Sequence, residues 1–183
     1  MKHPRCVAIG EIGFNNITAN EETVFRQQLK LAADYGMLAI VHLPHFNKID
    51  GVRRTIDVIK SVDIPEENVI IDHNTEDCIG LARQTGCYTG MTVYPISKLT
   101  PERVSNIVKE YGTDRMIING SADWGLSDPL SLVKVTDFMR GDGHTEKDIR
   151  KILFENPNKF YSRSAKWKPD FGIVPLDPRE FQR

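Results

Sequence analysis

The feature that most constrains the fold is a repeated alternation of short apolar runs with longer amphipathic segments. Five runs of four to seven residues are almost wholly apolar, and a segment whose apolar residues recur at helical spacing follows each of them. Strands that are apolar throughout, rather than at every second position, are typical of parallel sheets buried between helices. The runs are residues 6–9, 37–41, 69–72, 88–94 and 116–119. The sequence therefore predicts an α/β protein.

Signals for helix starts and stops bound the segments between these strands. Thr100 followed by Pro101 is a strong start, because the hydroxyl can cap the helix and proline suits its first position. Gly36 and Gly112 stand where glycine commonly ends a helix. We expect helices over residues 21–35, 51–62, 76–84, 101–111 and 128–140, opened by Asn20 in the first case, and a last helix that Thr145 caps and Asn156-Pro157 breaks.

Two architectures fit this order, an open doubly wound sheet and a (β/α)8 barrel. In a barrel, functional side chains come from the carboxyl ends of several strands, and this chain carries ionisable residues at four such ends. We therefore expect an incomplete (β/α)8 TIM-type barrel, with about five of eight strand–helix units, over residues 1–161. A C-terminal extension follows over residues 162–183. By the usual barrel length, about 80 to 90 residues of the barrel are missing.

The four strand ends carry side chains that bind metals. Glu11 lies in the turn Gly10-Glu11-Ile12-Gly13, and the other three are His42, His73 and Asp123. Imidazole nitrogens and carboxylate oxygens together suit divalent ions, and we expect one or two of Zn, Mn or Mg. Glu11 would bridge two ions, and Asp123 would bind the first and accept the proton of the attacking water. Glu11 and Asp123 are thus the candidate catalytic residues.

Each of these residues also has a purely structural interpretation. Glu11 alone is a solvated turn carboxylate, either histidine alone is a hydrogen-bonded strand-end residue, and Asp123 alone caps a turn. Their joint occurrence at four strand ends favours the metal site. His45 and Trp124 are candidate substrate contacts, with a solvated loop histidine and an aromatic ring packed under a loop as the alternatives. Lys98 and Arg103 lie at a helix start, and we expect no role for them beyond solvation.

Composition narrows the class of protein. The 183 residues carry a net charge of −1, with lysines and arginines scattered, so no strong nucleic-acid surface is expected. No segment has the apolar length of a membrane span or the pattern of a signal peptide. Three cysteines without a CxxC spacing indicate reduced thiols in a cytoplasmic protein. A small-molecule or nucleotide-type substrate remains compatible with this charge balance.

The turn Ile9-Gly10-Glu11-Ile12-Gly13, the helical segment from Phe25 to Gly36 and the strand end Ile40-Val41-His42 resemble the TatD-related metal-dependent hydrolases. These are enzymes of the amidohydrolase-like barrel class. The late segment from Ile152 to Tyr161 is similar to their terminal helix, so the resemblance spans about residues 5–161. It implies that Glu11, His42, His73 and Asp123 match four of the family's metal ligands. Members are often nucleases that cleave phosphodiesters.

The chain departs from the family pattern in two informative places. The family's first strand carries a His-x-His pair, and this chain has none, which implies a sequence incomplete at its N-terminus. Two positions after the first histidine the family usually has an arginine suited to phosphate, whereas Leu43-Pro44-His45 follows His42 here. The family's substrate is therefore not carried over, and an ester, phosphodiester, amide or lactone bond all remain candidates.

Two functions from different classes follow. The first is a metal-dependent hydrolase of which this chain is an N-terminally incomplete part, so that activity is expected of the complete protein rather than of this fragment. The second is a non-catalytic binding or assembly protein built on a degenerate barrel. Five parallel strands leave two unpaired edges, and self-association could cover them.

Overall fold

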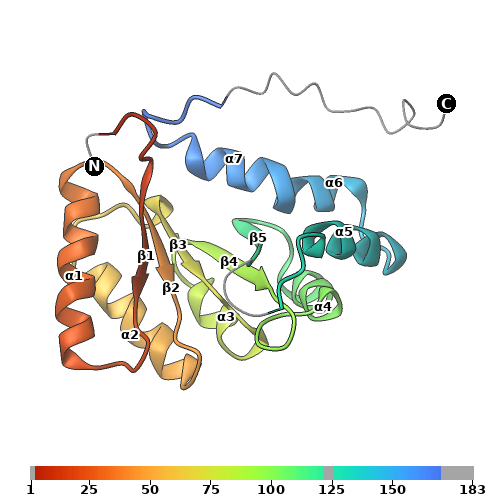
Figure 1. Ribbon diagram of the computed structural model, residues 1–183, viewed down its shortest axis with the longest axis horizontal. Coiled ribbons are helices and arrows are strands. Elements are labelled where there is room, and N and C mark those ends of the chain that lie inside the picture. Colours follow the sequence, from red (N-terminus) through yellow and green to blue (C-terminus); the bar gives the residue numbers. More distant parts are fainter. Residues whose placement is uncertain (1–2, 122–125, 170–183) are drawn as a thin grey trace.

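The computed structural model describes residues 3–121 and 126–169, and the predicted alternation of strands and helices is present in them (Figure 1). Five strands form one parallel sheet in the order β1-β2-β3-β4-β5. The strands are β1 (Ala8–Gly13), β2 (Leu38–His42), β3 (Val69–Asp72), β4 (Tyr88–Val93) and β5 (Met116–Gly120). A doubly wound sheet reverses its strand order, whereas this sheet keeps chain order throughout, as a barrel does. The fold is therefore that of a partial (β/α)8 barrel.

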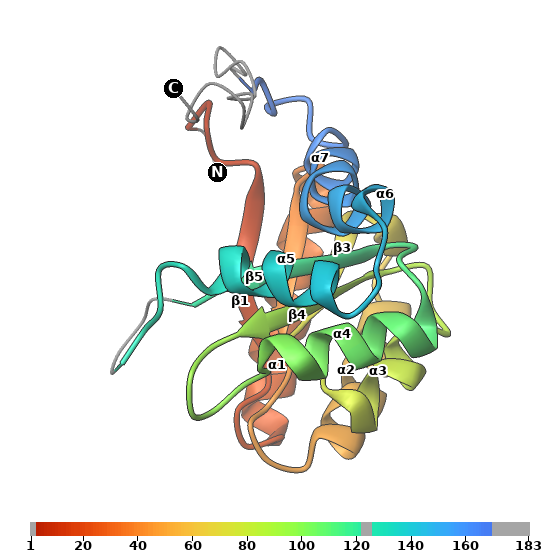
Figure 2. The ribbon, with the colours of Figure 1, turned by 90° about the vertical axis from the view of Figure 1, so that its right-hand side faces the viewer.

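Helices connect the strands and cover one face of the sheet, whose strand direction turns progressively from β1 to β5 (Figure 2). A short 3-10 turn, Glu66–Asn68, precedes β3, and a π-helical segment, Lys151–Glu155, joins the last two helices. The α-helices are α1 (Ala19–Asp34), α2 (Lys48–Lys60), α3 (Glu76–Ala82), α4 (Pro101–Tyr111), α5 (Ser131–Gly141), α6 (Glu146–Arg150) and α7 (Asn156–Tyr161).

The first helix is capped by Thr18, not by Asn20 as predicted. The Glu21 backbone N–H donates to the Thr18 hydroxyl at 3.2 Å, and the Thr18 backbone N–H donates to the Glu21 carboxylate at 2.8 Å. This reciprocal pair is a capping box, which satisfies two helix-end donors that have no partner within the helix. Two further starts differ from prediction, since α2 begins at Lys48, before residue 51, and α5 begins only at Ser131.

The predicted break at Asn156-Pro157 is wrong, because the chain continues as a helix through both residues. The π-helical segment Lys151–Glu155 stands directly before α7. A π-turn widens the backbone so that a proline, which has no N–H to donate, can follow without ending the helix. Asn156 then anchors this helix, because its side-chain amide donates to the backbone carbonyls of Thr113 and Met116, at 2.7 Å each.

The two faces of the sheet have different cores. On the helix-covered face, alternate strand residues such as Val41 and Ile71 pack with α1, α2 and α3, and Met91 and Met116 pack with α4 and α5. The other face, which we call the inner face, buries a separate cluster near the amino ends of the strands, and Phe160 of α7 closes it. This cluster consists of Leu38, Ile70, Tyr88, Ile117 and Phe160. The carboxyl ends of the inner face are left for polar residues.

Within the described residues, the structure holds no helix with both the length and the apolar character needed to cross a bilayer.

Candidate metal centre

The carboxyl ends of the strands place a polar layer on the inner face. Side chains alternate across a strand, so in β2 the residues Leu38, Ile40 and His42 share this face. The register then pairs His42 with Asp72 of β3, and Thr92 of β4 with Asn119 of β5. Polar side chains thus follow apolar ones along each strand, and they meet at one end of the sheet.

Glu11 reaches this layer through a bulge in β1. The pairing with β2 runs from Gly10 opposite Ile40 to Ile12 opposite Val41, which leaves Glu11 as the extra residue. A bulge bends its strand and re-aims the side chain of the inserted residue. Gly13 allows the end of β1 to lie close to His42 of β2. A Cβ atom at Gly13 would lie 2.4 Å from the His42 carbonyl oxygen, and the φ of Gly13 is +144°.

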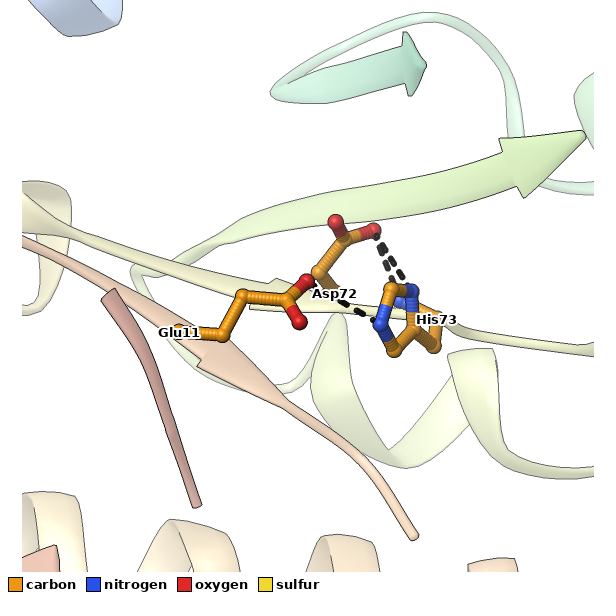
Figure 3. A group of neighbouring side chains, drawn as sticks. All are labelled: Glu11, Asp72 and His73. Atoms are coloured by element: carbon orange, nitrogen blue, oxygen red, sulfur yellow. Dashed lines mark hydrogen bonds and ion pairs between the residues drawn. The ribbon is translucent and has the colours of Figure 1, made fainter. Parts of the chain in front are cut away.

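His73 lies at the centre of the site. It follows β3 in a left-handed backbone conformation, with φ of 63°, and its Nε2 lies 3.1 Å from Oε1 of Glu11 (Figure 3). The Lys48 ammonium at the start of α2 donates to the His73 carbonyl oxygen at 2.7 Å. The side chain of His73 is only 13% exposed, compared with 53% for Glu11. The His73 side chain is therefore mostly buried, and its backbone is fixed by Lys48, whereas the Glu11 carboxylate is about half exposed to solvent.

The other nitrogen of His73 is held by a network of hydroxyl, carboxylate and amide groups. Nδ1 lies 2.7 Å from the Thr92 hydroxyl oxygen, and the Thr92 hydroxyl donates to Oδ1 of Asp72 at 3.3 Å. The Asn119 amide donates to the other Asp72 oxygen at 2.9 Å, and the His73 backbone N–H donates to Oδ1 at 2.6 Å. Asp72 is buried, and room for its carboxylate depends on Gly90, where a Cβ atom would lie 2.3 Å from Oδ1.

His42 stands beside this pair. Its ring centroid is 6.4 Å from that of His73, with the two rings inclined at 66°. Burial lowers the pKa of His42 below its ordinary value, although the nearby Glu11 carboxylate opposes this shift. A histidine with a lowered pKa is neutral at pH 7, which is the form that binds a metal.

Charge at the site favours an ionised Glu11. The hydrogen bond from His73 lowers the pKa of the Glu11 carboxyl below its usual value, more than burial raises it, and the charge of Lys98 acts in the same direction as the bond. Burial lowers the pKa of the Lys48 ammonium. Glu11 is therefore available as an anionic ligand near neutral pH.

The donor set fits a divalent cation. Glu11, Asp72 and His73 each offer a ligand atom, and these atoms lie within 4.8 Å of one another. Carboxylate oxygen and imidazole nitrogen suit zinc and manganese, and His42 adds a second imidazole on the neighbouring strand. Both Asp72 oxygens already accept hydrogen bonds, so Asp72 also positions the segment that carries His73.

The sequence-based predictions for the site have different outcomes. The structure brings Glu11, His42 and His73 together, whereas the predicted residues Asp123 and Trp124 lie outside the described residues. His45 lines an open depression of about 470 Å³ together with His42 and His73.

Sequence reasoning missed the residues that support the histidines, which are Asp72, Thr92 and Asn119. Period-two alternation along the strands could have found them, because each shares a face with His42. The expectation that Lys98 serves only solvation is wrong, since its Nζ lies 3.3 Å from Nε2 of His73.

Comparison with known proteins agrees with this geometry. The model of the family described as "TatD related DNase" matches residues 1–162. An uncharacterized metal-dependent hydrolase of Methanocaldococcus jannaschii is 32% identical over 155 residues, which cover 85% of this chain and 61% of that protein. The chain thus spans about three-fifths of the length of this relative.

Solved structures give the same result. The crystal structure of a TatD-like protein from Archaeoglobus fulgidus has a TM-score of 0.68 at 28% identity, with 85% of this chain and 60% of that chain covered. A phosphotriesterase homology protein from Escherichia coli, complexed with phosphate in its active site, has a TM-score of 0.65 at 19% identity and 85% and 57% coverage, which shows a shared fold. The match over residues 1–162 includes the polar layer at the strand ends, and the chain belongs to the TatD-related DNase family.

Proposed function

We propose that this chain forms the larger part of a metal-dependent hydrolase of TatD type, in which a divalent ion activates water against an ester, phosphodiester, amide or lactone bond. The observation that carries this proposal is the short distance between Glu11 in β1 and His73 after β3. Oε1 of Glu11 lies 3.1 Å from Nε2 of His73. A carboxylate oxygen and an imidazole nitrogen this close together, with His42 beside them, could bind the same metal ion in place of the hydrogen bond between them.

The residues present have distinct tasks in this proposal. His42 and His73 would supply ring nitrogens to a bound ion, and Glu11 would supply an anionic carboxylate. A bound divalent ion, Zn, Mn or Mg, would lower the pKa of water and polarise the bond to be broken. Asp72 and Thr92 hold the His73 ring in place, and the buried apolar inner face beneath them keeps water from approaching from that side.

The remaining predicted residues complete the proposal. Asp123 would be a further ligand and would accept the proton from the attacking water. His45 and Trp124 would contact the substrate, and the position of His45 on the depression beside His42 supports this role for it. The relatives are longer than this chain, so we place full activity in a barrel completed by further strand–helix units. The free thiols Cys6, Cys78 and Cys87 fit a cytoplasmic setting.

The test is a metal-binding and hydrolysis experiment on matched variants. Calorimetric titration with Mn²⁺ and with Zn²⁺ would measure affinity for the chain and for Glu11→Gln and Asp123→Asn. We expect Glu11→Gln to weaken metal binding about tenfold or more, because an amide oxygen replaces a charged ligand. The same proteins would be assayed against an aryl phosphodiester and an aryl ester, with added Mn²⁺, and Glu11→Gln would lose any hydrolysis.

Glu67→Gln is the control, because Glu67 is exposed and lies just before β3, at the opposite end of the sheet. It should bind metal as the unaltered chain does. Hydrolysis that survives both Glu11→Gln and Asp123→Asn would refute the proposed site.

A further inference from the structure

Two lysines approach His73 from different parts of the chain. Lys98, in the connection between β4 and α4, places Nζ 3.3 Å from Nε2 and 3.5 Å from Nδ1 of His73. Lys48, in the first turn of α2, reaches the His73 carbonyl oxygen at 2.7 Å. Both side chains line a small cavity of about 30 Å³ beside the imidazole. Two cations are thus drawn to one side of the candidate metal centre.

Within the described residues, the carboxylates of Glu11 and Asp72 act on these two ammonium groups through charge, without a salt bridge. Among the residues that the structure describes, neither Lys48 nor Lys98 forms an ion pair, although other lysines such as Lys109 and Lys134 do. The small cavity has no acidic residue in its lining, and neither has the adjoining depression of about 470 Å³. Their linings hold instead the hydroxyl of Ser97 and the imidazole of His45. Half-buried ammonium groups that lack an ion-pair partner carry a desolvation cost that an anion would offset.

The backbone of Lys98 is fixed by a second layer of contacts. Arg103 donates from Nη1 to the Lys98 carbonyl oxygen at 3.1 Å. The same guanidinium forms a two-point pair with Glu76 at the start of α3, with distances of 2.7 and 2.6 Å. This pair ties the loop that carries Lys98 to the helix that follows His73. The Lys98 ammonium is therefore carried by a loop whose backbone is fixed by hydrogen bonds, as is typical of binding sites.

We propose that Lys98, assisted by Lys48 and Ser97, binds an anionic group of the substrate, a phosphate or a carboxylate, next to the metal centre. This inference rests on the proposed function for the identity of the bound group as part of a substrate. Lys98 and Glu11 both lie close to Nε2 of His73, at 3.3 and 3.1 Å, so an anion bound by Lys98 would lie next to the candidate metal ligands. Charge-assisted hydrogen bonds from lysine to an oxyanion fix the substrate so that the bond to be broken faces Glu11.

The division of charge also accounts for the absence of an arginine after His42. The segment Leu43-Pro44 that follows β2 is buried and offers no cation. The cationic groups come instead from the first turn of α2, which follows this segment, and from the connection between β4 and α4. In this proposal, Lys48 and Lys98 supply the positive charge that an arginine after His42 would otherwise supply.

The test is calorimetric titration of the full chain with inorganic phosphate and, separately, with acetate, at constant ionic strength set with chloride. We expect Lys98→Met to weaken binding of the favoured anion about tenfold or more, since one charge-assisted hydrogen bond is lost. Lys98→Arg should keep most of the affinity. Lys30→Met is the control, because Lys30 is exposed on α1 and pairs only with Asp34 among its described neighbours.

Mn²⁺ titrations of the same proteins separate this inference from the proposed function. Lys98→Met should bind Mn²⁺ as well as the unaltered chain or better, because a nearby positive charge is removed. Tighter binding of phosphate than of acetate would assign a phosphorylated substrate, and the reverse would assign a carboxylate. Failure of the unaltered chain to bind either anion, or equal binding by Lys98→Met, would overturn the inference. Failure to bind Mn²⁺ alone would tell against the hydrolase and leave the anion site standing.

Discussion

At the scale of single residues, the hydroxyl of Thr92 is the informative feature of the site. A threonine hydroxyl both donates and accepts, so it can pair with Nδ1 of His73 whichever ring nitrogen carries the proton. When Nε2 faces a cation, Nδ1 must carry the proton, and Thr92 then accepts from it while donating to Asp72. The hydroxyl thus serves both the free and the loaded state.

This arrangement predicts the effect of removing the hydroxyl. Thr92→Val should lower Mn²⁺ affinity by about 10- to 100-fold, the usual effect of losing a group that orients a ligand. Thr92→Ser keeps the hydroxyl and should restore most of the affinity. Calorimetric titration measures the affinities, and nitrogen chemical shifts of the His73 ring report which nitrogen is protonated. Equal affinities for Val and Thr at this position would show that Thr92 only fills space.

At the scale of elements, the site depends on how closely β3 and β4 approach. Asp72 fits between them because Gly90 has no side chain. The strand β4 contributes none of the candidate ligands, but its Gly90 leaves room for the Asp72 carboxylate and its Thr92 contacts His73. The bulge in β1 has a comparable effect, since it turns Glu11 towards the inner face.

We expect Gly90→Ala to destabilise the chain by about 1 to 3 kcal/mol, the range for overpacking a filled site. Urea unfolding followed by circular dichroism measures the change. Gly141→Ala is a suitable control, since no atom lies within 4 Å of a Cβ built there at the end of α5. That variant should be as stable as the unaltered chain or slightly more stable. If Gly90→Ala unfolded at the same urea concentration as the unaltered chain, the close fit between Gly90 and Asp72 would not contribute to the free energy of unfolding.

At the scale of the whole molecule, the described sheet has two edges, because β1 pairs only with β2 and β5 only with β4. An unpaired parallel edge presents backbone N–H and carbonyl groups that can pair with another strand. We propose that this chain, taken alone, self-associates through these edges.

Hydrogen exchange at two protein concentrations tests this proposal. Amides of β1 and β5 should exchange more slowly at the higher concentration, whereas amides of β3, paired on both sides, should be unaffected and serve as the internal control. Light scattering after gel filtration would report the mass in parallel. A monomer at all concentrations, with constant exchange in β1 and β5, would exclude association through the edges.

The sequence by itself determined the class of fold and the positions of three residues of the candidate site. Wholly apolar runs separated by capped helical segments require a buried parallel sheet, and residues that directly follow such runs lie at its carboxyl edge. Glu11, His42 and His73 could therefore be predicted without coordinates. The helix limits were less accurate at Thr18 and Asn156, because caps and π-turns depend on side-chain contacts with neighbouring turns.

Only the tertiary structure decided which residues support and complete the site. Asp72, Thr92 and Lys98 come from three different segments, and their contacts with His73 depend on strand register and loop path. Spacing along a chain gives no direct measure of these, since a register shift of one residue would turn each strand residue to the other face. The periodicity of the chain determined the sheet and the edge at which the candidate site lies. Three-dimensional packing determined which charged and hydrogen-bonding groups surround that site.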